Sequence, residues 1–179
     1  MTAAPLIATL TAPRDLPALA DVRPVIVVDS REQAPLPFRR LPSVRGTLQS
    51  GDYSALGLEQ ALAIERKSIP DLVACVTSGR ERFERELHRL RGFHFKRLLI
   101  VGTRADVEAG HYRSRVTPAS VLHSLFAWEA RYDLPVVFCP TPEAAAEQVE
   151  SWAFWYAREM VKNVNQLLKK GRQTNEMQG

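Results

Sequence analysis

The chain has 179 residues, of which 45% are hydrophobic and 25% are charged. This length and composition are typical of one folded domain with an apolar core, and they exclude a largely disordered chain. The sequence holds no run near the roughly 18 apolar residues that a membrane-spanning helix needs. Its start also lacks the basic region of a secretory signal, so we expect a cytoplasmic protein without a membrane partner.

Basic residues outnumber acidic residues by 24 to 20, which gives a net charge of +4 at pH 7. This excess is compatible with a polyanionic partner such as a nucleic acid, but it does not require one. Arginine supplies most of the basic residues. Guanidinium groups suit two-point binding of phosphate, whereas a compositional bias of the genome gives the same excess, so both explanations stay open.

The first part of the chain is predicted to lead into a sheet. Residues 1–21 are rich in Ala, Pro and Thr and are predicted to form a loose leader before a single domain over residues 22–179. A β-branched run at residues 25–28 predicts a buried strand that ends at Asp29. Residues 45–56 predict a short strand or hairpin arm, broken by a turn at residues 50–52. Residues 61–67 predict the next strand, and the loop containing Gly57 indicates a hairpin.

The remainder is predicted to alternate helices with strands. The predicted helices begin at Ser68, Arg80, Thr117 and Pro142, the last of them running to about residue 170, and the predicted strands cover residues 96–102 and 134–138. Two of these helices begin at a Thr-Pro pair, a favourable helix start. The pattern predicts an α/β fold with a mixed sheet flanked by helices and a long C-terminal helix.

Acidic residues surround one lysine of the third predicted strand. Residues two apart on a strand share a face, so Glu65 and Lys67 are predicted to project together. Asp52 lies on the neighbouring hairpin arm and Asp29 ends the first strand, so both are expected to reach the same place. Three carboxylates near one lysine repel one another unless a cation lies among them. Oxygen ligands without a nearby His or Cys pair favour Mg²⁺ or Mn²⁺ over Zn²⁺.

This set of residues suits hydrolysis of a phosphodiester bond. In such a site a metal holds the phosphate and activates water, while a lysine orients that water or neutralises the developing charge. An acid followed by acid-x-lysine on one strand is the minimal pattern of the PD-(D/E)xK nucleases. The pattern also arises by chance, and without further context an exposed ion pair between Glu65 and Lys67 is the simpler interpretation.

The longer string around these residues resembles the XPF family of structure-specific endonucleases. Residues 51–53 (GDY) followed by residues 64–72 (IERKSIPDL) are similar to the family's GD(Y/F)…ERKxxxD signature. Residues 27–32 (VVDSRE) are similar to its V-x-D-x-R-E element, and Gly79 and Arg80 lie where the family has a Gly-Arg pair. The resemblance implies a restriction-endonuclease-like fold.

The resemblance also implies roles for individual residues. The implied ligands of Mg²⁺, for which Mn²⁺ can substitute, are Asp29, Asp52, Glu65 and Glu32. The residues implied to complete the catalytic site are Asp52, Glu65, Arg66, Lys67, Asp71 and Arg31. Nuclease domains of this family cut one strand of branched DNA near a junction of duplex and single strand. The expected function is therefore a metal-dependent DNA endonuclease acting on branched or flap DNA.

The chain departs from most of the family in one respect. Most relatives carry a C-terminal tandem helix-hairpin-helix domain with Gly-rich hairpins, and this chain has no such pair after Gly102, so a stand-alone nuclease domain is expected. The family's nuclease domains characteristically pair. Because the C-terminal helix also carries an aromatic-rich surface that includes Trp152, Trp155 and Tyr156, we expect a homodimer.

Some of these residues have simpler structural interpretations. Ser68 and Asp71 match a helix capping box, which does not exclude a catalytic role for Asp71. Arg66 shares the apolar face of its strand and needs a partner, for which Asp71 is the predicted candidate.

The helix over residues 80–91 carries the candidates for contact with the DNA backbone: Arg80, Arg82, Arg85 and Arg89. Arg82, Arg85 and Arg89 fall on one face of the predicted helix, opposite its apolar stripe. The alternative is a solvated helix with internal ion pairs such as Glu81 with Arg85.

Two competing functions stay open. One is a DNA-binding or scaffold module whose nuclease chemistry has decayed, and the other is a PD-(D/E)xK nuclease with another substrate, such as RNA. The presence of Asp52, Glu65, Lys67 and Asp71 argues against decay.

Overall fold

The computed structural model describes residues 23–176. These residues divide into two compact units, one formed by residues 23–157 and the other containing the chain from Arg158 onward. The long helix α5 (Pro142–Glu176) begins in the first unit and ends in the second, six residues beyond its predicted end at residue 170. The predicted leader lies outside the described residues, and the single domain over residues 22–179 stays a prediction.

The first unit is built on a six-stranded mixed sheet with the order β2-β1-β3-β4-β5-β6. The strands are β1 (Ile26–Asp29), β2 (Ser43–Gly46), β3 (Tyr53–Ala55), β4 (Leu62–Ser68), β5 (Phe95–Val101) and β6 (Val136–Cys139). β3 runs antiparallel to both of its neighbours, and the other neighbouring strands are parallel. The carboxyl ends of β1, β4, β5 and β6 therefore meet at one edge of the sheet. This arrangement confirms the predicted fold class.

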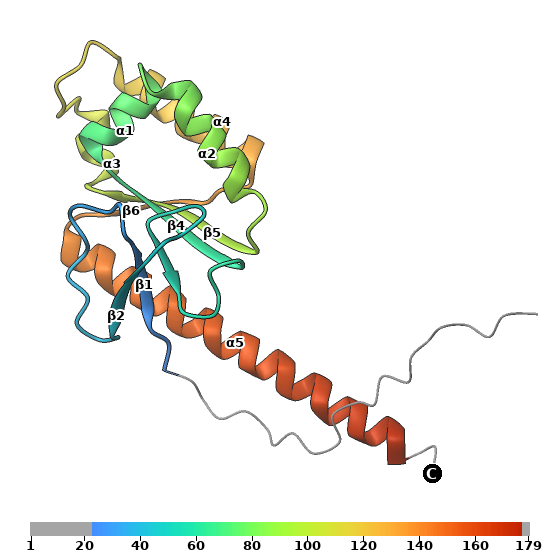
Figure 1. Ribbon diagram of the computed structural model, residues 1–179. Coiled ribbons are helices and arrows are strands. Elements are labelled where there is room, and N and C mark those ends of the chain that lie inside the picture. The colour runs from blue at the N-terminus through green and yellow to red at the C-terminus, as the bar shows by residue number, and fades with distance from the viewer. Residues whose placement is uncertain (1–22, 177–179) are drawn as a thin grey trace, which may run out of the picture. The chain divides into compact units, whose positions relative to one another are not determined.

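Helices cover both faces of this sheet (Figure 1). One face is covered by α1 (Ile69–Val76), α2 (Arg80–Leu90), α3 (Arg104–Glu108) and α4 (Pro118–Tyr132), and the first part of α5 covers the other. On the α5 face, the ring centre of Phe95 lies 6.0 Å from that of Trp152 and 5.4 Å from that of Tyr156. None of the helices within residues 23–176 is long and apolar enough to cross a membrane.

The core on the first face explains why these segments fold as they do. The apolar stripes of α1, α2 and α4 meet the inward side chains of β4 and β5 in one buried cluster that includes Leu72, Leu87, Trp128, Leu98 and Ile100. These five side chains are fully buried, and burying each such side chain contributes roughly 1.5 to 3 kcal/mol. The cluster holds α1 and α2 firmly beside the end of β4.

The structure differs from the prediction at two elements. The strand predicted over residues 45–56 is two strands: β2 pairs in parallel with β1, and β3 pairs with β1 and β4 in antiparallel. The hairpin through Gly57, which has a φ of 82°, is confirmed. The short helix α3 was not predicted, because five residues are too few to show a helical period. A capping box between Thr103 and Asp106 begins it.

A buried carboxylate fixes the loop after β1. Glu150 of α5 is only 2% exposed. Its Oε1 accepts hydrogen bonds from the backbone N–H groups of Arg39, Arg40 and Leu41 at 3.0, 2.6 and 2.9 Å. A carboxylate that receives three backbone donors is a strong anchor. The anchor fixes the far end of the loop whose first residues form a wall of the cleft described next.

Candidate active site

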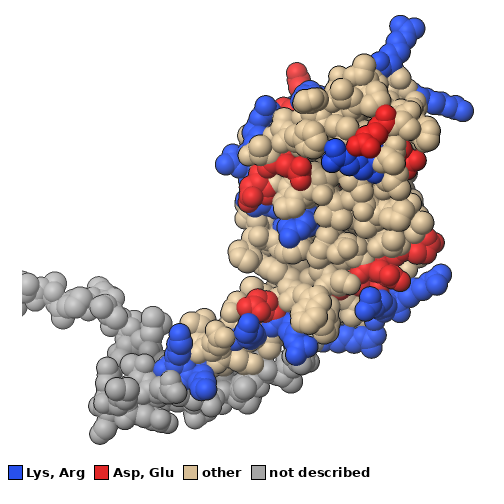
Figure 2. Space-filling view, turned by 180° about the vertical axis from the view of Figure 1, so that it is seen from behind, with Lys and Arg blue, Asp and Glu red and all other residues tan. Residues whose placement is uncertain are grey.

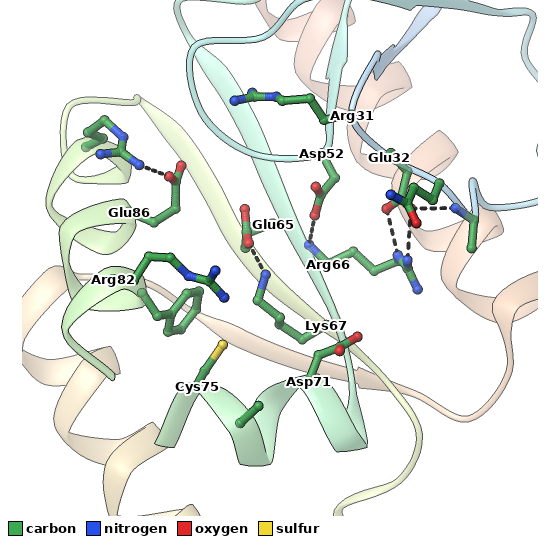
Figure 3. Close-up of a pocket in the computed structure, with 15 residues that line it drawn as sticks. Arg31, Glu32, Asp52, Glu65, Arg66, Lys67, Asp71, Cys75, Arg82 and Glu86 are labelled. Atoms are coloured by element: carbon green, nitrogen blue, oxygen red, sulfur yellow. Dashed lines mark hydrogen bonds and ion pairs between the residues drawn. The ribbon is translucent and has the colours of Figure 1, made fainter. Parts of the chain in front are cut away.

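A cleft of about 630 Å³ opens beside the carboxyl end of β4. Its walls come from the loop after β1, the turn before β3, the end of β4 and the helices α1 and α2 (Figure 3). The predicted site residues that line it are Arg31, Glu32, Asp52, Glu65, Arg66, Lys67, Asp71, Arg82 and Arg89. The predicted residues outside its walls are Asp29, Arg80 and Arg85. Most of the predicted site is therefore brought together in one place.

Glu65 and Lys67 project from one face of β4 and form an ion pair. Their side chains are only 8% and 17% exposed. The Lys67 ammonium also lies 5.1 Å from the centre of the Phe83 ring, which adds a cation–π contact. The prediction that both residues share a face is confirmed, and the alternative of an exposed surface pair is wrong.

A tight turn places Asp52 beside this pair. The Asp52 N–H donates to the carbonyl oxygen of Ile64 at 2.8 Å, and Asp52 Oδ2 accepts from the Arg66 N–H at 2.7 Å. Gly51 has a φ of 78°, and a Cβ at that position would come within 3.0 Å of the Ile64 carbonyl oxygen. The turn therefore needs glycine, which gives the Gly51-Asp52 part of the motif a physical reason.

Burial shapes the electrostatics of the cleft. Burial raises the pKa of Glu65 to about 7, and the nearby Asp52 charge adds to this rise while Lys67 opposes it. Burial also raises the pKa of Asp52, against the lowering by the Arg66 N–H and by Lys67. Burial lowers the pKa of Lys67, but the charge of Glu65 raises it by more, so that the pKa lies above its usual value and Lys67 stays an ammonium. Two carboxylates that resist ionisation together suit a bound cation.

The donor set fits a hard divalent cation with open positions. Within residues 23–176, no three His, Cys, Asp or Glu side chains lie close enough together to hold a metal ion. Mg²⁺ is nevertheless commonly bound by one or two carboxylates, with waters and substrate phosphates as its other ligands. Asp52 and Glu65 provide such a pair on one cleft wall, whereas Zn²⁺ requires three or four protein ligands.

Glu32 and Arg66 form a two-point ion pair at the other side of the cleft. Arg66 Nε and Nη2 donate to Glu32 Oε2 and Oε1, each at 3.1 Å. The side chains are 6% and 17% exposed for Glu32 and Arg66. The prediction that Arg66 pairs with Asp71 is wrong, because the side chain of Arg66 pairs with Glu32 of the loop after β1. The pair joins that loop to β4, and the part of Glu32 as a metal ligand stays a prediction.

Asp29 is buried at the end of β1 and holds the start of the same loop. Its Oδ1 accepts from the Arg31 N–H at 2.9 Å and from Arg31 Nε at 2.7 Å, and its Oδ2 accepts from the Leu48 N–H at 2.8 Å. Burial alone raises the pKa of Asp29, but hydrogen bonds from Arg31 and Leu48 lower it to about 2. The expected meeting of Asp29 with Asp52 and Glu65 on the cleft wall is not observed, and its role as a ligand stays a prediction.

Asp71 lies in the first turn of α1, beside the N-cap Ser68, and lines the cleft. Ser68 Oγ accepts from the Asp71 N–H at 3.2 Å and donates to Asp71 Oδ2 at 2.6 Å. The predicted helix start is confirmed with Ser68 as the N-cap. Because Asp71 also lines the cleft, its carboxylate keeps a second oxygen for a partner on the open side.

The four arginines of α2 separate into two groups. Arg80 packs between α2 and α4: it pairs with Glu84 at 3.2 Å, donates to Ser124 Oγ at 3.2 Å and lies 5.7 Å from the Trp128 ring centre. These contacts give Arg80 a structural role, and its DNA contact stays a prediction. The others are exposed, with Arg82 and Arg89 on the cleft wall and Arg85 outside it.

Glu86 is the acidic cleft residue that the sequence did not single out. It lies on α2, pairs with Arg89, and accepts from the Gly51 N–H at 3.4 Å. Its charge also contributes to the raised pKa of Glu65, after burial and Asp52. A glutamate beside an arginine on a helix is too common to signal a site, so this contact becomes visible only in the folded chain.

Comparison with known proteins agrees with the fold. A family model described as the ERCC4 domain matches residues 28–151. Similar solved structures include XPF from Aeropyrum pernix in complex with DNA, with 22% identity and a TM-score of 0.62 over 76% of this chain and 66% of that chain. Another structure, XPF from Aeropyrum pernix, has 21% identity and a TM-score of 0.58 over 73% and 60%.

The chain spans less than two thirds of the length of either solved chain, 66% and 60%. At these identities the likeness concerns the fold. No curated protein matches the chain.

Proposed function

Because the chain belongs to the ERCC4 domain family, we propose that it is a metal-dependent endonuclease that hydrolyses phosphodiester bonds in DNA. The observation that carries the proposal is that Asp52, Glu65 and Lys67 line one cleft. These are the residues that the XPF pattern marks, and the contacts that hold them join separate parts of the chain.

Asp52 and Glu65 are the residues assigned to hold the cation. When bound, Mg²⁺ or Mn²⁺ supplies Lewis-acid chemistry to a phosphate oxygen and lowers the pKa of water. Burial keeps both carboxylates from ionising easily, so the protein itself favours compensation by a positive charge. Asp29 and Glu32 stay candidate ligands of the same cation, although each is engaged by an arginine.

Lys67 is assigned to the charge that develops on the phosphate. The charge of Glu65 keeps Lys67 protonated despite burial, and an ammonium has three donors. With one donor held by Glu65, the others are available to a phosphate oxygen or to the attacking water. Preorganised donors of this kind stabilise the transition state because they need no reorganisation during the reaction.

Arginines at the cleft are assigned to positioning the substrate. Arg31 is held by Asp29, yet its side chain is 69% exposed, so its outer N–H groups can meet a phosphate. Arg66 is tied to Glu32 and fixes the wall. Asp71, beside the open side, completes the proposed site.

Branched or flap DNA, cut near a junction of duplex and single strand, is the proposed substrate. It is supported by the XPF-family resemblance, and one similar solved chain was crystallised with DNA. Arg82 and Arg89 on the cleft wall offer a path for the phosphate backbone. On the face shown in Figure 2, basic side chains lie near acidic ones around a broad uncharged area.

We also propose that the protein is a homodimer. Within residues 23–157, α5 exposes 63% of Trp155. The later part of α5 exposes 41% of Val164 and 71% of Leu167. Apolar and aromatic side chains exposed on a helix are typical of subunit interfaces. Sedimentation over a range of concentrations is expected to reveal a dimer, and a monomer at every concentration would contradict the proposal.

A cleavage assay on matched substrates tests the proposed activity. Labelled flap DNA, linear duplex DNA and structured RNA of equal length are incubated with the protein and Mg²⁺. Cleavage of the flap near its junction, with slower or no cleavage of the other two, is the expected result. Binding of flap DNA without cleavage would instead support a scaffold module, and preferred cleavage of RNA or of linear duplex would support another type of PD-(D/E)xK nuclease.

A further inference from the structure

Glu86 projects from α2 at the cleft (Figure 3), and it contacts both the turn that carries Asp52 and Arg89 of its own helix. Its Oε1 accepts from the Gly51 N–H at 3.4 Å, while its Oε2 pairs with Arg89 one turn further along the helix. The Glu86 side chain is 19% exposed. One carboxylate of the helix therefore contacts both the metal-binding turn and a residue of the proposed DNA path.

Within residues 23–176, the other hydrogen bonds of this turn join it to the sheet and not to a helix. On the β4 side, the Asp52 N–H bonds to the carbonyl oxygen of Ile64 at 2.8 Å. On the other side, the Asp52 carbonyl oxygen accepts from the Asp29 N–H at 2.9 Å, whereas Ser50 Oγ is a buried polar atom without a hydrogen-bond partner in the described part of the chain. The contact of Glu86 with the Gly51 N–H is thus the side-chain contact that ties this turn to α2.

The location of this contact matters because Gly51 directly precedes Asp52. Gly51 has a φ of 78°. Glycine adopts this conformation and many others at little steric cost, so the backbone at Gly51 is easily displaced. A hydrogen bond to its N–H therefore restrains a flexible point of the backbone. The Arg66 N–H holds Asp52 Oδ2 directly at 2.7 Å, and restraint at Gly51 adds to what sets the position of the Asp52 carboxylate relative to Glu65.

We propose that Glu86 is a positioning residue of the cleft: held by Arg89, it fixes the Gly51 N–H and thereby holds Asp52 in place to share a cation with Glu65. This inference rests on the proposed function, because it concerns the same cation. Glu86 acts through Gly51 and Asp52 and needs no contact with the cation itself. Its role resembles that of the outer hydrogen-bond partners that orient the ligands of metal sites.

One test measures the binding of Mn²⁺ to the DNA-free protein by electron paramagnetic resonance. Glu86→Ala removes the contact, and Glu86→Gln keeps an acceptor oxygen for the Gly51 N–H. We expect Glu86→Ala to weaken Mn²⁺ binding roughly tenfold, at the low end of what loss of an outer partner costs. We expect Glu86→Gln to recover most of the affinity. A failure of Gln to improve on Ala would overturn the inference, since charge alone would then explain the effect.

The chain offers a matched control on the same helix. Glu81 is exposed, lies in the first turn of α2 and does not line the cleft. Glu81→Ala removes the same charge and is expected to leave Mn²⁺ affinity unchanged. Equal losses in the Glu81 and Glu86 variants would overturn the inference, because a general change in net charge would then be the cause.

Hydrogen exchange at the Gly51 amide gives a readout that needs no metal. NMR is expected to show faster exchange at Gly51 in Glu86→Ala than in wild type or in Glu81→Ala, with the other core amides unchanged. Unchanged exchange at Gly51 would overturn the inference. If wild-type protein bound no Mn²⁺, the proposed cation site would fail, and the exchange at Gly51 would still decide whether Glu86 holds the turn.

Discussion

Replacing Glu65 with Gln is expected to make the protein more stable at alkaline pH while strongly lowering its activity. The folded chain raises the pKa of the Glu65 carboxyl from 4.5 to about 7, mainly through burial. The stabilisation that comes from the protonated carboxyl is therefore complete below pH 4.5 and is lost as the pH rises through about 7. Gln cannot ionise, so the variant keeps this stabilisation at every pH.

The size of the effect follows from the same shift. A change from 4.5 to about 7, at about 1.4 kcal/mol for each pKa unit, corresponds to at most about 3.5 kcal/mol in the free energy of unfolding. Wild type and variant are expected to differ little at pH 4.5. Above pH 8 the variant is expected to be more stable by a substantial part of this amount, because the wild-type carboxylate is then ionised beside Asp52.

Urea denaturation of both proteins at several pH values, in the presence of EDTA, measures this difference. The chelator matters because a bound cation would itself favour the ionised carboxylate and reverse the trend. A difference in unfolding free energy that does not change between pH 4.5 and about pH 8.5 would refute the argument. Greater stability of wild type at high pH would show that the Lys67 pair outweighs burial.

Three further outcomes are expected. Arg82→Ala should weaken DNA binding and lower the slope of log affinity against log salt by about 0.9. Arg85 lies outside the cleft, so Arg85→Ala should change this slope less. Equal slopes for the two variants would contradict a DNA path along the cleft. Arg80→Ala should lower the free energy of unfolding in urea by roughly 0.5–1.5 kcal/mol, because the hydrogen bond to Ser124 and the pair with Glu84 are lost, and unchanged stability would contradict a packing role. Mn²⁺ affinity, measured by titration, should fall as the pH drops through about 7, because protons then compete for Glu65; an affinity independent of pH would contradict this.

Local sequence signals predicted much of the structure. The alternation along β4 placed Glu65 and Lys67 on one face, and the Ser68 and Asp71 spacing gave the cap of α1. Both features depend on neighbours two or three residues apart. The turn at Gly51 was also visible in the sequence, because a Gly-Asp pair between two strands signals a change of chain direction.

The rest of the site depends on contacts between distant parts of the chain. Arg66 was expected to pair with Asp71, five residues away, but its partner Glu32 lies 34 residues away on another loop. Parallel pairing of β2 with β1 likewise has no local signature. The contact between Glu86 and Gly51 spans 35 residues. Such pairs depend on how the sheet order brings loops together, which the pattern of one segment does not encode.

Single-turnover cleavage of flap DNA by wild type and Glu65→Gln tests the central claim most directly. Wild type is expected to cut with Mg²⁺ or Mn²⁺ and to stop in excess EDTA or with Ca²⁺ alone, since Ca²⁺ takes more ligands at longer distances. The folded variant is expected to cut more slowly by a factor of roughly 10² or more, because a preorganised charge has been removed from the cleft. Undiminished cleavage in EDTA, or near wild-type cleavage by the folded variant, would contradict the account.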